Sequence, residues 1–308
     1  MKNFIDISDC SSAELRQILD EAKKRKLNRS GLNKSAPDAD KPFEGKSMAM
    51  IFEKPSTRTR MSFDIAVKQL GGSTIILNPD GIHYGKGEET LKDTAKVLSE
   101  YVDIVMLRTS THDNLLSFGK YLNVPVINGL SDKSHPCQIM SDIFTFEESN
   151  GDISGKTICW IGDGNNNMSN SLIESAARFN IVLKIGCPKK YSPNTKIINW
   201  AKKNKVNLTI TSNPFDAAKD ADCIMTDKWI SMNDKVNKKS KKKILKPYQV
   251  NKKLMAKAKS SAIFMHCLPV GRGEEVTDEI IDGNQSVVWR QALNRVHAQK
   301  SIIKWCLD

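Results

Sequence analysis

The chain alternates between short apolar runs and longer amphipathic segments, and this alternation limits the folds open to it. The runs at 47–52, 73–78, 103–108 and 124–129 have the composition of buried strands. The segments between them place apolar residues three and four positions apart, as one face of a helix requires. Strands that alternate with helices in this way form parallel sheets covered by helices on both faces. We therefore predict an α/β fold.

The same alternation begins again after a helical stretch from Gln138 to Asn150. Further strands are predicted at 157–162, 182–187, 222–227, 262–267 and 286–289. Two such sets in 308 residues fit two domains of about 150 residues each. We predict that residues 1–137 form the first domain and residues 138–289 the second, each a parallel sheet flanked by helices. The last helix, 290–308, is expected to pack back on the first domain.

The composition is typical of a globular protein in a reducing compartment. Hydrophobic residues make up 39% and charged residues 27% of the chain. Asp6, Asp9 and Glu14 stand where a secretion signal would need an apolar core, and no apolar run reaches the length of a membrane helix. The seven cysteines are scattered and form no C-x-x-C pair. We expect a cytoplasmic protein without a membrane partner.

The net charge of +12 comes mainly from one segment. Residues 234–259 contain eleven lysines and one acid, Asp234. Nucleic-acid surfaces usually mix arginine and stacking rings with lysine, but this segment has no arginine and a single aromatic residue, Tyr248. We interpret it as a solvated loop that leads into a lysine-faced helix, and we expect no nucleic-acid partner. Nucleic-acid binding through this segment remains the non-enzymatic alternative.

A hydroxyl- and arginine-rich segment, STRTR at residues 56–60, follows the first predicted strand and opens a helix. Ligands of parallel α/β sheets bind at the carboxyl ends of the strands. A helix N-terminus offers free N–H groups and a positive dipole end there, and hydroxyls and guanidinium groups add donors for a phosphate. From these residues alone, an ordinary N-cap with surface arginines is an equally good interpretation.

Polar groups also occupy five other strand ends. They are Arg108, the HPCQ sequence at 135–138, GDGNNN at 162–167, Asp227 with Trp229, Ser231 and Met232, and HCLP at 266–269. One such cluster is typical of a structural cap, but five at successive strand ends indicate a binding site. A dinucleotide site is disfavoured because Asn167 occupies the place of the third glycine. A nucleophilic pair of Cys267 and His266 is disfavoured because adjacent strand residues point to opposite faces.

The motifs STRTR, HPCQ and HCLP, in this order and at these separations, resemble the aspartate/ornithine carbamoyltransferase family over almost the whole chain. Three details resemble its ornithine-specific members. Lys54 stands two residues before Ser56, where aspartate-specific members usually carry an acid. The segment DKWISM at 227–232 matches a D-x-W-x-S-M pattern, and Cys267 is the ornithine-type residue of HCLP.

The resemblance implies transfer of the carbamoyl group of carbamoyl phosphate to the δ-amine of L-ornithine. The products would be L-citrulline and phosphate, a step of arginine biosynthesis, and neither a cofactor nor a metal would be needed. The resemblance also implies a homotrimer or a multiple of trimers, with active sites between subunits. The main alternative is a carbamoyltransferase for another amine or amino acid, such as aspartate, putrescine or an acylated ornithine.

The resemblance further implies a role for each motif residue. The groups expected to bind the phosphate are Ser56, Thr57, Arg58 and Thr59. The groups expected at the carbamoyl oxygen are Arg108, His135 and Thr59, and those at the carbamoyl nitrogen are Gln138, Arg295 and the carbonyls of Cys267 and Leu268. The residues expected to bind ornithine are Asn167, Asp227, Ser231 and Met232. Those expected to act in catalysis are Arg108, His135, Asp227, Cys267 and Arg295.

The chain departs from the family pattern at three places. Asn233 follows Met232 where ornithine-specific members generally carry glycine, although asparagine tolerates the left-handed conformation well. The loop GIHYGKGEETLKDT lacks a glutamine near its start, where His83 or Tyr84 stands. In the family this loop approaches the carbamoyl phosphate of a neighbouring subunit, and the sequence does not predict which residue would make that contact here. The lysine-rich segment 234–259 lies where a loop that closes over ornithine is expected.

Overall fold

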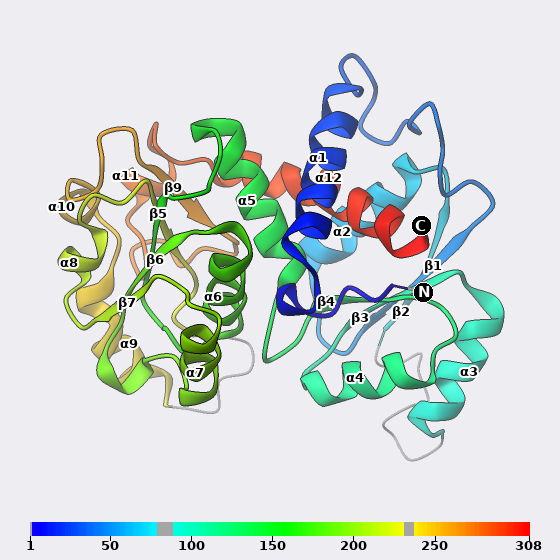
Figure 1. Ribbon diagram of the computed structural model, residues 1–308, viewed down its shortest axis with the longest axis horizontal. Helices are drawn as coiled ribbons and strands as arrows, with labels where there is room; N and C mark the ends of the chain where they lie inside the picture. Colours follow the sequence, from blue (N-terminus) through cyan, green and yellow to red (C-terminus); the bar gives the residue numbers. More distant parts are fainter. Residues whose placement is uncertain (1, 79–88, 231–236) are drawn as a thin grey trace. The chain divides into compact units, whose positions relative to one another are not determined.

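The computed structural model describes residues 2–78, 89–230 and 237–308 (Figure 1). The chain divides into two compact units, which we call unit 1 (Met1–Phe144 with Leu293–Asp308) and unit 2 (Thr145–Ala292). The chain passes from one unit to the other inside α5 (Pro136–Asn150) and again inside α12 (Val288–Leu307). The boundaries that we predicted from the sequence fall in the same two helices.

Unit 1 is built on a four-stranded parallel sheet in the order β2-β1-β3-β4. Its strands are β1 (Ser47–Phe52), β2 (Ser73–Leu77), β3 (Ile104–Arg108) and β4 (Val126–Leu130). Its helices are the 3-10 turn η1 (Ile7–Asp9), α1 (Ser12–Leu27), α2 (Thr57–Gln69), α3 (Leu91–Tyr101) and α4 (His112–Tyr121). Alternate strand residues such as Ala49, Ile51 and Val105 share one buried cluster with Leu98 of α3 and Phe118 of α4. The helices α3 and α4 therefore cover one face of the sheet (Figure 1).

The C-terminal part of α12 packs against the N-terminal segment of unit 1, as predicted. Trp305 makes an edge-to-face contact with Phe4, with ring centroids 6.1 Å apart. Lys300 is fully buried, and its ammonium group lies 2.8 Å from an Asp38 carboxylate oxygen. Burial lowers the pKa of Lys300 to about 8, against the opposing effect of Asp38. Lys300 is therefore still a cation at neutral pH, and the ion pair links α12 to the segment that follows α1.

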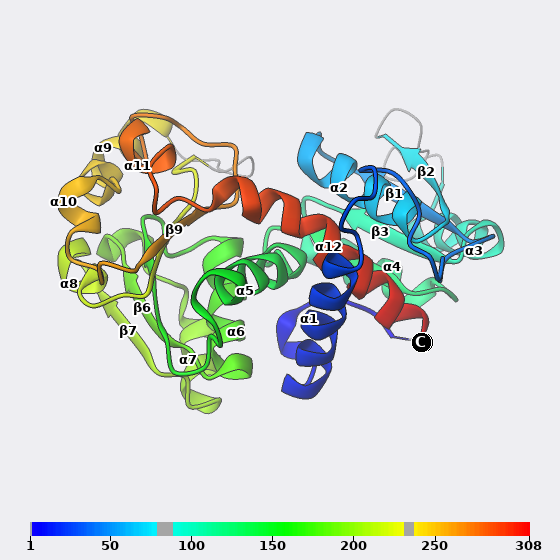
Figure 2. The same ribbon diagram turned by 90° about the horizontal axis from the view of Figure 1, so that it is seen from above.

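Unit 2 contains a five-stranded parallel sheet in the order β7-β6-β5-β8-β9. Its strands are β5 (Thr157–Ile161), β6 (Val182–Gly186), β7 (Leu208–Thr211), β8 (Cys223–Thr226) and β9 (Ile263–His266). Its helices are α6 (Asn167–Phe179), η3 (Lys189–Tyr191), α7 (Thr195–Lys203), α8 (Pro214–Ala218), α9 (Lys238–Leu245), η4 (Lys246–Tyr248), α10 (Lys252–Met255) and α11 (Asp278–Ile281). Figure 2 shows α6 and α7 on one side of this sheet and α8 and α10 on the other.

The structure corrects two strand assignments. The predicted strand 286–289 is wrong, because Ser286 forms only an isolated bridge to Phe264 and α12 begins at Val288. The strand β7 was missed from the sequence. It lies at the edge of the sheet and is only partly buried, so threonines replace part of the apolar run that marks the central strands. Within the described residues, no helix is both long and apolar enough to cross a membrane.

Candidate active site

The segment between β1 and α2 forms the predicted helix N-terminus. Ser56 is the N-cap of α2, and its hydroxyl oxygen accepts a hydrogen bond from the Thr59 N–H at 3.3 Å. Thr59 is buried, Arg58 is partly buried and Thr57 is exposed. Ser56 thus acts as an ordinary cap. The hydroxyl and guanidinium groups that follow it lie in the first turn, where the dipole of a helix favours an anion.

The hydroxyl group of Thr59 connects three elements of unit 1. Arg108, the last residue of β3, donates to Thr59 Oγ1 at 3.3 Å. Arg295 of α12 donates to the same oxygen at 2.9 Å, and its other terminal nitrogen donates to Gln138 Oε1 in the first turn of α5. Arg108 and Arg295 are only 8% and 4% exposed. The structure therefore brings together four of the residues predicted to bind carbamoyl phosphate.

His135 lies beside this group and is neutral. Burial lowers its pKa well below the ordinary value, and the charges of Arg295, Arg108 and Arg58 lower it further. A neutral imidazole can donate one hydrogen bond without carrying a charge of its own. Three guanidinium groups that act on one buried ring form a concentrated positive field, which favours an anionic ligand.

The loop before His135 is held by a buried carboxylate that the sequence did not reveal. Asp6 accepts hydrogen bonds from the hydroxyl of Ser134 and the ammonium of Lys133, and His112 Nε2 lies 3.4 Å away. Burial alone would raise the pKa of Asp6, but the hydrogen bonds from His112, Lys133 and Ser134 lower it to about 2. Asp6 is thus an anion at neutral pH and fixes the turn that leads into His135.

In unit 2, Asp227 and Cys267 are in contact. They follow the neighbouring strands β8 and β9, whose last residues Thr226 and His266 are paired. The thiol of Cys267 donates to Asp227 Oδ1 at 3.1 Å, and the Lys228 N–H donates to the same oxygen at 2.7 Å. Both side chains are partly exposed. The structure therefore joins the two residues predicted to lie beside the reacting amine.

His266 shapes the segment that contains Cys267 and Leu268. Its Nδ1 accepts the Leu268 N–H at 2.8 Å, and its Nε2 lies 3.2 Å from Glu275 Oε1, so the proton is on Nε2. Leu268 has a φ of 58°, in the left-handed region that disfavours leucine. A ring nitrogen of His266 lies within 4.8 Å of the Cys267 sulfur and of an Asp227 carboxylate oxygen. The prediction that His266 and Cys267 point to opposite faces is therefore wrong, because β9 ends at His266 and Cys267 is no longer part of the strand. Both ring nitrogens of His266 are engaged with protein atoms, so its role is to hold this turn.

Asn167 is the first residue of α6, at the carboxyl end of β5. Its neighbour Asn166 is the N-cap and accepts the Ser169 N–H at 2.8 Å. The strand β5 lies next to β8 in the sheet, so the chain places Asn167 at the same edge as Asp227. The other predicted ornithine-binding residues, Ser231 and Met232, lie outside the described residues, as do Asn233, Asp234, His83 and Tyr84.

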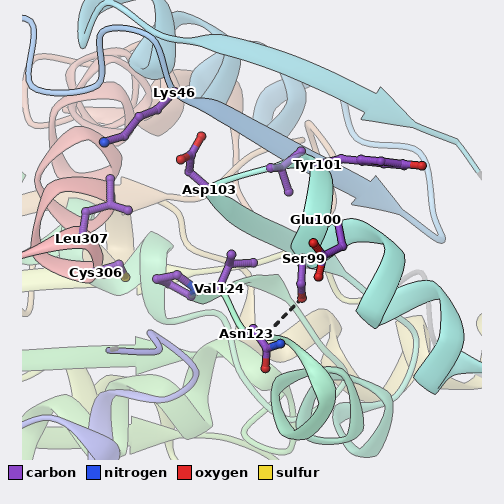
Figure 3. Close-up of a pocket in the computed structure, with 11 residues that line it drawn as sticks. Lys46, Ser99, Glu100, Tyr101, Asp103, Asn123, Val124, Cys306 and Leu307 are labelled. Atoms are coloured by element: carbon purple, nitrogen blue, oxygen red, sulfur yellow. Dashed lines mark hydrogen bonds between the residues drawn. The ribbon is translucent and has the colours of Figure 1, made fainter.

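A separate pocket lies at the opposite edge of the sheet of unit 1 (Figure 3). Lys46, Asp103 and Pro125, which line it, directly precede β1, β3 and β4. Asp103 accepts the Ser47 N–H at 2.7 Å, so this carboxylate caps the amino end of a strand. The predicted anion-binding residues are at the carboxyl ends of the same strands. This pocket therefore contributes nothing to the candidate site.

Comparisons with known proteins identify the family of the chain. The carbamoyl-P binding domain of aspartate/ornithine carbamoyltransferases matches residues 2–148, and their Asp/Orn binding domain matches residues 154–306. The chain is 51% identical to the ornithine carbamoyltransferase of Brucella ovis over 308 residues, which is 100% of this chain and 96% of the relative. It is also 51% identical to that of Agrobacterium fabrum, with 99% and 98% covered.

Solved structures give the same result. The ornithine carbamoyltransferase from Pyrococcus furiosus superimposes with a TM-score of 0.92 at 42% identity, over 98% of this chain and 96% of that one. The anabolic enzyme from Campylobacter jejuni gives a TM-score of 0.91 at 35% identity, over 99% of each chain. The family matches cover both units, and these relatives and solved structures match over at least 96% of their own length. The chain therefore belongs to the aspartate/ornithine carbamoyltransferase family.

Proposed function

We propose that this enzyme is an ornithine carbamoyltransferase that converts carbamoyl phosphate and L-ornithine into L-citrulline and phosphate, as a step of arginine biosynthesis. The observation that carries the proposal is the grouping of Arg58, Arg108 and Arg295 around the neutral His135 and the hydroxyl of Thr59. The names of the relatives and of the solved structures support ornithine as the second substrate.

Unit 1 supplies the residues for carbamoyl phosphate. The phosphate group of carbamoyl phosphate binds at the first turn of α2, to Ser56, Thr57, Arg58 and Thr59. Arg108, His135 and Thr59 donate to the carbamoyl oxygen, and Gln138 and Arg295 bind the carbamoyl nitrogen end. Negative charge grows on that oxygen as the amine attacks, and donors fixed in advance stabilise it more than they stabilise the substrate. His135 acts as a hydrogen-bond donor here and does not titrate near neutral pH.

Unit 2 supplies the residues for ornithine. Asn167, Asp227, Ser231 and Met232 bind its α-amino and α-carboxylate groups, and Asp227 and Cys267 flank the δ-amine. The δ-nitrogen uses its lone pair to form a bond with the carbamoyl carbon, the bond from that carbon to the phosphate oxygen breaks, and phosphate leaves with the electron pair. The amine loses one proton in the step, the departing phosphate accepts it, and the Asp227 carboxylate favours that loss.

The assembly and the cellular location are part of the same proposal. The enzyme is a homotrimer or a multiple of trimers, and this rests on the family resemblance. It works in the cytoplasm, which fits the seven cysteines, all of which lie in the described residues as free thiols. Neither nucleic acid nor a membrane is a partner.

The test is a steady-state assay of carbamoyl phosphate with ornithine, aspartate, putrescine and an acylated ornithine. We expect ornithine to be preferred over aspartate by roughly a thousandfold, because a second carboxylate beside Asp227 costs several kcal/mol. Putrescine should also be poor, since it leaves the groups that bind the α-carboxylate unpaired. Equal use of aspartate or putrescine would overturn the ornithine assignment and leave the family membership intact.

A further inference from the structure

One lysine of the lysine-rich segment differs from its neighbours. Lys241 in α9 is only 2% exposed, whereas Lys238, Lys239 and Lys243 of the same helix are exposed. Lysine is almost never fully buried unless its charge is paired. Solvation accounts for the exposed members of the run, but Lys241 needs a different explanation.

The partner of Lys241 is a buried carboxylate at the carboxyl end of β5. Lys241 Nζ lies 2.6 Å from Asp163 Oδ2, and the two side chains are 3% and 7% exposed. The ammonium also lies over the ring of Tyr191, 5.2 Å from its centroid. The ion pair is therefore largely shielded from water, which strengthens it and makes the loss of either partner costly.

Asp163 connects the ion pair to the backbone segment that leads into α6. Its second carboxylate oxygen, Oδ1, accepts the Asn165 N–H at 2.8 Å, and its carbonyl oxygen accepts the Trp160 indole N–H at 2.9 Å. The next residue, Asn166, is the N-cap of α6, and Asn167 is its first residue. A shift of the Asp163 carboxylate would therefore move the turn that places Asn167.

We propose that Lys241 is a positioning residue for ornithine, which it serves by holding Asp163 and thereby the turn 163–167. The inference rests on the proposed function, because it is that function which assigns Asn167 to ornithine. Lys241, Asp163 and Asn167 all belong to unit 2, whereas the residues proposed for carbamoyl phosphate in unit 1 have their own supports, such as Asp6. The effect of losing Lys241 should therefore fall on one substrate.

The experiment compares Lys241→Gln with Lys243→Gln, which removes the same charge from an exposed position of the same helix. For Lys241→Gln we expect the KM of ornithine to rise by about tenfold or more, because small misplacements of positioning groups have effects of that size. The KM of carbamoyl phosphate should change by less than about twofold in Lys241→Gln. In Lys243→Gln, the KM values of ornithine and of carbamoyl phosphate should both change by less than about twofold. Lys241→Arg keeps the charge and should restore most of the ornithine affinity.

A double variant guards against simple loss of folding. Lys241→Gln leaves Asp163 as an unpaired buried anion, whereas Lys241→Gln with Asp163→Asn removes both charges. We expect this folded double variant to retain a raised KM for ornithine, because the link to the Asn165 N–H is weakened. Equal increases in both KM values, or unchanged kinetics in Lys241→Gln, would overturn the inference. A wild-type enzyme that forms no citrulline would instead overturn the proposed function.

Discussion

The predicted site residues of the two units are organised in different ways. In unit 1 they share direct hydrogen bonds, because the hydroxyl of Thr59 accepts from Arg108 and Arg295, and Arg295 also donates to Gln138. In unit 2 the described ones follow three separate strands, and the Cys267 thiol donates a hydrogen bond to Asp227 between two of them. An anion such as phosphate is bound best by donors that are fixed before it arrives.

The difference also follows from the chemistry of the two ligands. Carbamoyl phosphate carries its charge at one end and reacts beside it, so a compact group of cations can bind the charge and stabilise the reaction. Ornithine carries an ammonium and a carboxylate at one end and reacts at the other end. Its binding groups must therefore be spread over several strand ends, and each depends on its own supporting contacts. The following predictions test whether the two units can be perturbed separately.

The largest effect is expected from Arg58→Ala in unit 1. The loss of one charge-assisted donor to the phosphate should lower kcat by about a hundredfold to a thousandfold, because water cannot replace it in a closed site. Arg60→Ala is the matched control, since Arg60 is exposed on the next part of the same helix. Steady-state citrulline formation by the purified, folded variants measures both. Nearly normal turnover in Arg58→Ala would contradict the phosphate assignment.

A smaller and more selective effect is expected from Asp227→Asn in unit 2. The change keeps the size of the side chain but removes the charge that pairs with the ammonium end of ornithine. We expect kcat/KM for ornithine to fall by about a hundredfold, in the range found when one partner of a desolvated charge pair is lost. The assay varies each substrate at saturating levels of the other. An equal fall in kcat/KM for ornithine and for carbamoyl phosphate would show that the site residues of the two units cannot be perturbed separately.

The pH dependence should reflect ornithine and not His135. Attack requires an unprotonated δ-amine, so kcat/KM for ornithine should rise between about pH 6 and pH 10. Because the pKa of His135 is well below 6.5, its protonation should add no step near that value. The lowered pKa of His135 also affects the stability of the fold. Below about pH 6.5 the unfolded state takes up a proton that the folded state does not, so the free energy of unfolding decreases as the pH falls below that value. An acid limb near pH 6.5 that disappears in His135→Gln would contradict this account.

The smallest effect is expected for the binding of DNA by the lysine-rich segment. Lys242, Lys252 and Lys259 each lie within ion-pair distance of a carboxylate, which reduces the local positive charge. We expect only weak retention on immobilised duplex DNA at low salt, lost at physiological ionic strength. Column elution over a salt gradient measures it. Tight, sequence-selective retention would support the nucleic-acid alternative.

The sequence predicted both sheets because buried parallel strands are continuous apolar runs. The strand ends indicated most of the candidate residues because ligands bind there, whereas Arg295 and the role of each residue came from the family resemblance. The strand β7 was missed because edge strands need fewer apolar residues. The positioning contacts could not be predicted at all. Ser134 and Asp6 are 128 positions apart, and neither side chain has an unusual sequence context. Such pairs become visible only when the fold brings their elements together.

The central claim is that the unit 1 residues form a phosphate site that does not depend on the ornithine residues of unit 2. Titration calorimetry of carbamoyl phosphate into the ornithine-free enzyme tests it most directly. We predict binding to the wild type without ornithine, unchanged within about twofold in Asp227→Asn and abolished in Arg58→Ala. Binding that requires ornithine, or that is weakened as much by Asp227→Asn as by Arg58→Ala, would contradict the claim.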